Sequence, residues 1–328
     1  MEDCAVRVRP PLAACLARGV ETRLVIATTG PDLDSRVRAA ALAWLRQRCT
    51  PDDPVVTRRE LLNFQFEGQT FPLIDNQLGI RKPKGLAAAL SILTTYTSDR
   101  KRPPYEDAVG DDGLLRYKFQ GNLKHYTNAA LQVAHDRQVP LMWFFGIGPG
   151  LYLPFAPVWV TAVEADQSQV AVALEDSQRH LSVDGVTSEI ERRYSQRISR
   201  NRLHQPVFRQ RVIQAYESSC AMCRLRHRSL LDAAHIIPDR DVRGVPAVSN
   251  GVSLCKIHHA AYDENILGVR PDFVIEVRAD VLREVDGPML KHGLQEMQSV
   301  RLELPKRRAD RPNPDLLAER YERFRAAI

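Results

Sequence analysis

Hydrophobic and polar positions recur with two different periods along the chain, and each period predicts a different kind of element. Residues 35–48 carry apolar side chains at helical spacing, and residues 57–60 have the form of a capping box that opens a second short helix. Residues 64–71 alternate around a glycine turn, as a hairpin does. Two helices and a hairpin are typical of a small winged unit.

The middle of the chain is dominated by short strand patterns. Leu115, Tyr117 and Phe119 fall on one face of a predicted strand, and a short helix is expected over 127–137. Further strands are expected at 140–147, 151–155, 158–163 and 170–174. Short strands at this spacing predict a small, curved or closed sheet, and we place a first domain at 1–185.

A basic helix is expected to connect this domain to a second one. Residues 186–205 read as the linker, which is rich in arginine, and the second domain occupies 206–328. It begins with a helix over 207–218 and ends with a helical extension from about residue 314. The fold class predicted for the whole chain is α+β.

Length and composition agree with two folded domains. The chain has 328 residues, more than one ordinary core contains, and its 44% hydrophobic and 26% charged residues are near globular averages. No apolar run is long enough to span a bilayer, and the N-terminus opens with acidic residues rather than a signal peptide. We therefore expect a cytoplasmic protein.

The charge balance favours polyanionic partners. Lys and Arg number 46 and Asp and Glu 40, so the net charge is +6. Basic residues gather in two segments, and both are expected to contact DNA phosphates without regard to sequence. The candidates are Lys82, Lys84, Arg192, Arg193, Arg197 and Arg200.

Four of the soft metal donors stand in two close pairs. Cys220 and Cys223 form one C-x-x-C pair, and Cys255 and His258 form a C-x-x-H pair 32 residues later. Two such pairs suit tetrahedral Zn²⁺, because each closes a tight chelate turn and the metal joins the two turns. The sequence therefore predicts a structural zinc site, and a disulfide framework is not expected.

Between and after these pairs stand His235, Asn250 and His259, in that order. This order beside a double zinc knuckle resembles the HNH endonucleases, whose fold is the ββα-metal finger. The resemblance implies hydrolysis of phosphodiester bonds, with His235 as the general base. His259 and Asp263, four apart on a predicted helix, would hold a catalytic Mg²⁺ or Mn²⁺.

Two details of the motif bear on this site. Asn250 is expected to hydrogen bond across the loop that presents His235. Many HNH enzymes carry an Asp or His just before the base, and here that position is Ala234, which leaves the expected metal shell thinner. Asp232 would contribute only if the strand bends, because residues 232 and 235 point to opposite faces of a regular strand.

The resemblance extends beyond the motif. Residues 207–324, and segments around 105–117 and 140–145, look like bacterial proteins described as HNH restriction endonucleases. In modification-dependent enzymes of this kind, a PUA-like or SRA-like sheet domain reads a modified base, often by extruding it into an aromatic pocket. The rings expected to line such a pocket are Tyr105, Tyr117, Trp143, Phe145 and Tyr152.

Three functions therefore remain open at this point. The favoured one is a restriction-type endonuclease that acts on double-stranded DNA with modified cytosine. The second is an HNH nuclease of repair or a toxin or defence effector, and the third is a zinc-stabilised DNA-binding protein without hydrolysis, which Ala234 allows. Double-strand cleavage by a site that cuts one strand at a time would favour a homodimer.

Overall fold

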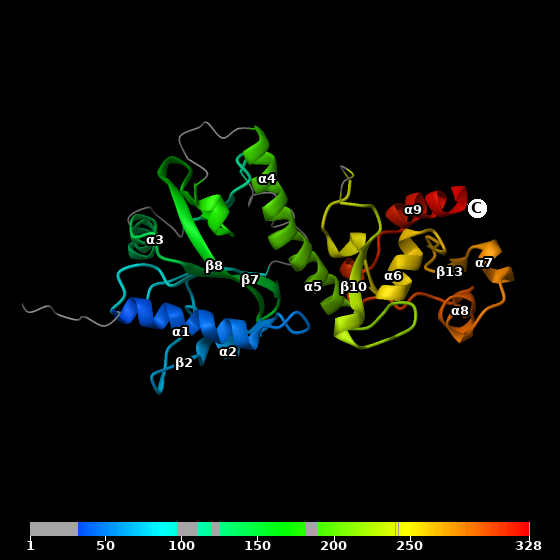
Figure 1. Ribbon diagram of the computed structural model, residues 1–328, viewed down its shortest axis with the longest axis horizontal. Helices are drawn as coiled ribbons and strands as arrows, with labels where there is room; N and C mark the ends of the chain where they lie inside the picture. Colours follow the sequence, from blue (N-terminus) through cyan, green and yellow to red (C-terminus); the bar gives the residue numbers. More distant parts are fainter. Residues whose placement is uncertain are drawn as a thin grey trace, which may run out of the picture.

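The computed structural model describes residues 32–96, 110–119, 125–180, 189–239, 241 and 243–327. Within these residues the chain is a mixed α/β protein. A curved sheet and a compact ββα unit lie on either side of a long helical rod (Figure 1). None of the helices in the described part of the chain has both the length and the apolar character that crossing a membrane requires.

Seven of the described strands form one sheet, in the order β4-β5-β7-β8-β9-β6, with β1 paired to β8. Strands β5 and β7 are parallel and the other pairs are antiparallel. Bulges between β7 and β8 and between β8 and β9 bend the sheet. A curved sheet is thus present, while its PUA-like or SRA-like identity stays a prediction. The bounds are β1 Val56–Thr57, β4 Ile80–Arg81, β5 Ser91–Thr94, β6 Leu115–Lys118, β7 Leu141–Gly148, β8 Leu151–Glu164 and β9 Gln169–Ala173.

One strand corrects the sequence prediction. The two strands expected at 151–155 and 158–163 are a single strand, β8. Proline has no N–H to donate, so Pro154 and Pro157 look like breaks in the sequence. In the structure the ladder jumps from Phe155 to Val158, and this bulge accommodates the second proline within a continuous strand.

Strand β7 separates two hydrophobic cores, because all eight of its residues are buried and alternate side chains face opposite ways. Trp143 and Phe145 pack with the buried face of α3, Tyr126–Asp136. Met142 and Phe144 pack with the buried face of α1, Leu33–Arg48. Helices therefore cover both faces of the sheet at its centre.

The elements expected near the N-terminus are present. Helix α2, Arg58–Leu62, opens with the predicted capping box between Thr57 and Glu60. The predicted hairpin is formed by β2, Gln65–Phe66, and β3, Gln69–Thr70.

The helix expected in the linker is continuous with the helix expected after it. Helix α4, Glu189–Ser199, continues through the π-helical turn η3, Arg200–His204, into α5, Gln205–Ala215, as one rod (Figure 1). The boundary predicted between residues 205 and 206 falls inside this rod, and the division into domains stays a prediction. Arg211 ties the rod to the sheet, since its guanidinium donates to the Gly146 carbonyl at 2.9 Å and lies 5.2 Å from the centre of the Tyr96 ring.

The ββα unit is built from β10, Leu231–His235, β11, Gly251–Cys255, and α6, Lys256–Asp263. The two strands pair antiparallel, with His235 opposite Gly251, and α5 packs across them. One hydrophobic core runs from Phe208 to Leu317. The remaining elements are η1 Ala165–Gln167, η2 Asp176–His180, η4 Arg228–Leu230, η5 Val248–Asn250, β12 Leu267–Val269, β13 Ile275–Val277, α7 Ala279–Arg283, α8 Pro288–Gly293, η6 Gln295–Met297, η7 Arg308–Asp310 and α9 Pro314–Ala326.

Candidate active site and metal centre

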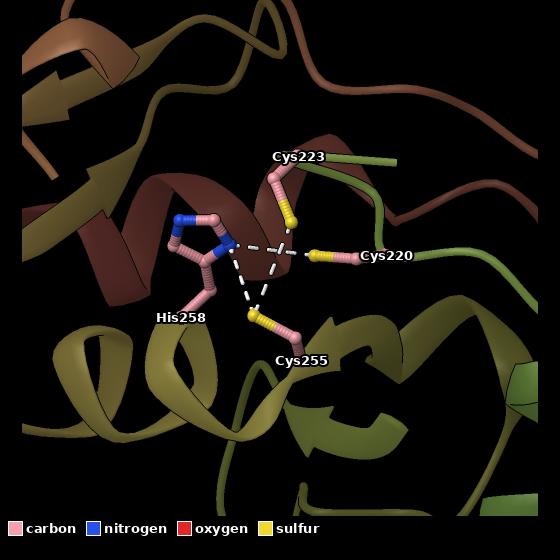
Figure 2. A group of neighbouring side chains, drawn as sticks. All are labelled: Cys220, Cys223, Cys255 and His258. Carbon is pink, nitrogen blue, oxygen red and sulfur yellow. Dashed lines mark hydrogen bonds between the residues drawn. The ribbon is translucent and has the colours of Figure 1, made fainter. Parts of the chain in front are cut away.

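The four predicted zinc ligands converge on one point. The side chains of Cys220, Cys223, Cys255 and His258 aim toward one another, and their ligand atoms all lie within 4.8 Å of one another (Figure 2). His258 Nδ1 is 3.4 Å from the Cys220 sulfur and 3.3 Å from the Cys255 sulfur, and the Cys223 and Cys255 sulfurs are 4.0 Å apart. The turn after α5 supplies one pair, and the junction of β11 and α6 supplies the other.

These distances fit a tetrahedral zinc ion. Ordinary Zn–S and Zn–N bonds give tetrahedral edges of about 3.8 Å between sulfurs and about 3.6 Å between sulfur and nitrogen. His258 Nε2 lies 2.7 Å from the Gly293 carbonyl, which fixes the ring with Nδ1 toward the cysteines. Hydrogen bonds from Cys220 and Cys223 lower the pKa of Cys255, so a thiolate forms readily there. The donor set therefore suits zinc.

His235 ends strand β10 and lines a cavity of about 460 Å³. Its imidazole stacks on the Phe208 ring with centroids 4.0 Å apart and planes 16° apart. Burial lowers the pKa of His235, and the nearby His259 acts in the same direction against the carboxylates of Asp239 and Asp263. A neutral imidazole at neutral pH is what a general base requires.

Asn250 makes the hydrogen bonds that were expected across the loop. Its side-chain oxygen accepts from the Ile237 N–H at 2.9 Å, and its side-chain nitrogen donates to the carbonyls of Ile237 and Val245 at 3.0 and 3.1 Å. The side chain is buried, so these bonds are shielded from water. Asn250 thus fixes the backbone directly after His235.

His259 lies between two carboxylates. Its Nε2 is 3.4 Å from Asp263, which confirms that residues 259 and 263 share one face of α6. Its Nδ1 is 3.6 Å from Asp232, and the carboxyl groups together raise the pKa of His259, Asp232 first. The role of His259 and Asp263 as metal ligands stays a prediction.

Asp232 departs from the sequence argument. Asp232 and His235 line the same cavity, although residues three apart point to opposite faces of a regular strand. His235 is the last residue of a five-residue strand, so the alternation no longer constrains its side chain. Arg209 of α5 pairs with Asp232 at 3.0 Å, and neither Arg209 nor Phe208 was singled out from the sequence.

The predicted basic residues of the linker line a cleft next to this cavity. Arg193, Arg197, Arg200 and His204 of the helical rod line a cleft of about 1000 Å³, together with Asp239. Arg200 and Asp239 are 3.5 Å apart. Arg192 is exposed on the same helix, and Lys82 and Lys84 lie beside strand β4.

The predicted base-pocket rings lie elsewhere than expected. Tyr117, Trp143, Phe145 and Tyr152 are all buried in the cores on either side of β7, with exposed fractions of 8% or less. The Tyr117 hydroxyl also donates to the Gly79 carbonyl at 2.9 Å. This corrects the prediction for these four rings, because strands with both faces covered by helices bury their aromatic side chains. Tyr105 lies outside the described residues.

A different set of rings lines an open cavity. Phe155, Trp159 and Tyr194 border a cavity of about 690 Å³ between β8 and the helical rod. Arg179 lies over the Trp159 ring at 5.0 Å, and Arg202 pairs with Glu175 at 3.1 Å on the same border. Trp159 and Tyr194 were missed because neither stands in a motif.

The π-helical turn η3 joins these features. Asn201 lines the aromatic cavity, the cavity at His235 and the basic cleft. π-Helical turns inside α-helices are frequent at functional sites. The three cavities thus meet at one turn of one helix.

Comparison with known proteins identifies the ββα unit. Residues 220–270 match the family model described as HNH endonuclease. No curated protein matches the chain. Among solved structures, one described as "Modification dependent TagI restriction endonuclease" is 17% identical, with a TM-score of 0.29, over 81% of this chain and 90% of that chain. The segment 220–270 is an HNH endonuclease domain.

Proposed function

We propose that this chain is a metal-dependent endonuclease that hydrolyses phosphodiester bonds in double-stranded DNA. The observation that supports it most is the convergence on one side of the HNH domain of a half-buried, stacked His235 and the group formed by His259, Asp232 and Asp263. A base and a cation site aimed at one phosphate are what this hydrolysis needs.

Each residue has a separate part in this proposal. His235 takes the proton from the attacking water, because burial keeps its imidazole neutral. His259 and Asp263 would hold a divalent cation, which neutralises charge as it develops on the phosphate and the leaving oxygen. Asn250 holds the loop that fixes His235. A structural zinc ion would join the two knuckles, bound by Cys220, Cys223, Cys255 and His258.

The DNA backbone is proposed to follow the helical rod. The cleft lined by Arg193, Arg197 and Arg200 adjoins the cavity at His235, so a strand held there by its phosphates reaches the base. Such contacts are independent of sequence and weaken as salt rises. Lys82, Lys84 and Arg192 would extend the basic surface.

Cleavage of supercoiled plasmid tests the activity. We expect nicking or linearisation with Mg²⁺ or Mn²⁺ that stops on adding EDTA and falls by about 10²- to 10⁴-fold in His235→Ala. His292→Ala is the control, because the exposed side chain of His292 in α8 pairs with Glu296 and does not line the cavity at His235. Metal-dependent binding without cleavage would instead support a zinc-stabilised DNA-binding protein.

We further propose that the enzyme is of the restriction type and responds to modified cytosine. The cavity bordered by Phe155, Trp159 and Tyr194 has aromatic walls and opens beside the basic cleft. A base extruded into it would gain stacking of about 1–3 kcal/mol, offset by the energy of unpairing. This cavity replaces the set of rings predicted from the sequence.

The test uses the full chain with His235→Ala, which binds without cutting. Matched duplexes that carry cytosine, 5-methylcytosine or 5-hydroxymethylcytosine are titrated at moderate salt. We expect tighter binding to a modified duplex, and loss of that preference in Trp159→Ala. Trp44→Ala is the control, since Trp44 packs against Phe64 on the far side of the sheet. Equal affinities for the three duplexes would instead support a nuclease that acts in DNA repair or as an effector.

A further inference from the structure

The imidazole of His259 is held from both edges by residues of different elements. Asp232 of β10 faces Nδ1 at 3.6 Å, and Asp263 of α6 faces Nε2 at 3.4 Å. The His259 side chain is 25% exposed, whereas that of Asp263 is 59% exposed. The side chain of Asp232 is 39% exposed, so the Nε2 edge lies beside the more exposed of the two carboxylates.

The carboxylate of Asp232 is itself anchored. Arg209 of α5 places Nε 3.0 Å from one oxygen of Asp232 and donates through Nη2 to the Leu231 carbonyl at 2.6 Å. The other oxygen of Asp232 is the one that faces His259. A guanidinium held at two points is a rigid donor, so the carboxylate has little freedom to turn.

We propose that Arg209 and Asp232 are positioning residues that orient the ring of His259 so that Nε2, beside Asp263, is the nitrogen offered to a divalent cation. This inference rests on the proposed hydrolysis and on His259 and Asp263 as the cation's ligands. A carboxylate on the far nitrogen of a metal-binding histidine fixes its orientation and its tautomer. The contact of 3.6 Å is longer than an ordinary hydrogen bond, so the hold on the ring is mainly electrostatic.

The same geometry argues against Asp232 as a ligand. Its first oxygen already faces the guanidinium of Arg209, and a divalent cation placed there would be repelled by that charge. Asp263 is more exposed, so a cation beside it keeps water molecules as further ligands, as Mg²⁺ prefers. The carboxylates on the two edges of His259 thus have different tasks.

The direct test measures Mn²⁺ binding by electron paramagnetic resonance, on the full-length, zinc-loaded protein without DNA. Asp232→Asn and Arg209→Met are expected to weaken Mn²⁺ binding by about tenfold or more, as loss of a carboxylate behind a metal-binding histidine does. Arg209→Lys keeps the positive charge but loses the two-pronged guanidinium. Its Mn²⁺ affinity is expected to lie between those of wild type and Arg209→Met.

The control is Arg278→Met. Arg278 pairs with Asp280 at 2.7 Å, and its side chain is 25% exposed, close to the 29% of Arg209. Its Mn²⁺ binding should equal that of wild type. Zinc content and melting temperature are measured for every variant, and if Arg209→Met loses zinc, Arg209→Lys and Asp232→Asn decide the question.

Cleavage at rising Mn²⁺ separates positioning from ligation. Asp232→Asn should recover most of the wild-type kcat at saturating Mn²⁺, whereas His259→Ala should not. Unchanged Mn²⁺ binding in both Asp232→Asn and Arg209→Met overturns the inference, and so does a loss in Asp232→Asn that no Mn²⁺ concentration restores. Because Mn²⁺ binding is measured without DNA, a wild-type protein that fails to cleave DNA refutes the proposed function separately.

Discussion

The ring of Phe208 is stacked on the imidazole of His235, with centroids 4.0 Å apart and planes 16° apart. The stack fits because Gly251, opposite His235 in the ladder, has no side chain: a Cβ there would stand 2.5 Å from Val212 Cγ2 and 2.8 Å from Phe208 Cζ. Phe208, on the helix that precedes the zinc knuckles, therefore covers one face of the imidazole of the candidate general base.

Replacing the Phe208 ring tests whether this stacking aligns His235. We expect Phe208→Leu to lower kcat/KM about tenfold or more, because a base that is no longer held in place loses effective alignment. The loss of stability should be about 1–2 kcal/mol, since Phe208 is a buried core residue. Steady-state kinetics and urea unfolding measure both.

A matched control separates alignment from stability. Phe324 of α9 is equally buried, at 2% exposure, and packs against β12 rather than the cavity. Phe324→Leu should cost similar stability with little change in kcat/KM. Equal kinetic losses in the two variants would show that the stack has no role of its own.

The pH dependence follows from the lowered pKa of His235, for which burial is the main cause. The acid limb of kcat/KM at saturating metal should lie below pH 6.5, the ordinary value for histidine. In Phe208→Leu it should move back toward 6.5, because the ring is better hydrated. A limb above 6.5 in the wild type would contradict this.

Stability should respond to the same group. The unfolded chain takes up a proton at His235 near pH 6.5, while the folded protein resists it until lower pH. This group therefore destabilises the fold as pH falls below 6.5, and contributes nothing above it. The difference in unfolding free energy between wild type and His235→Asn should change only in that window.

Zinc can be checked without any assay of activity. We expect about one Zn²⁺ per chain by elemental analysis, because the sulfur and nitrogen atoms of the cluster have tetrahedral spacing. Cys223→Ser should lose zinc and destabilise the fold around α6. Cys49→Ser should keep zinc, since Cys49 lies beyond the cluster and its pKa is raised by burial to about 11. Folded, active protein without zinc would defeat the assignment.

The parts of this site whose geometry is local could be predicted from the sequence. The spacing of Cys220 and Cys223, and of His259 and Asp263, is set within one turn of chain, so the structure shows the contacts that were expected. Asn250 was also predictable, because a loop that returns to its strand needs an internal hydrogen-bond partner.

The parts that depend on packing between distant segments were not predictable. Arg209 meets Asp232 across 23 residues, and no periodicity in α5 reveals that contact. The sequence around Trp143 and Phe145 does not indicate which face of the strand a helix covers. These rings were therefore expected in a pocket, whereas they form the core under α3. The two prolines of β8 likewise concealed a bulged strand.

The proposed role of His235 as the catalytic base is tested by removing its side chain. His235→Ala should reduce cleavage by about 10²- to 10⁴-fold, the usual contribution of a general base, while DNA affinity and zinc content stay close to wild type. Fluorescence titration without added Mg²⁺ or Mn²⁺ reports the affinity, and elemental analysis the zinc. Normal cleavage by this variant would show that His235 is not the base.

The basic cleft is tested by salt. Arg197 lines the cleft beside the cavity at His235, and a side chain that contacts one phosphate contributes about one unit to the slope of log K against log salt. Arg197→Gln in the His235→Ala background should weaken binding equally for modified and unmodified duplexes and reduce the slope by about one. Arg325→Gln, an exposed arginine of α9, should leave the slope unchanged. If the two variants behave alike, the cleft is not the path of the DNA backbone, and the contacts that guide DNA to His235 lie on another surface.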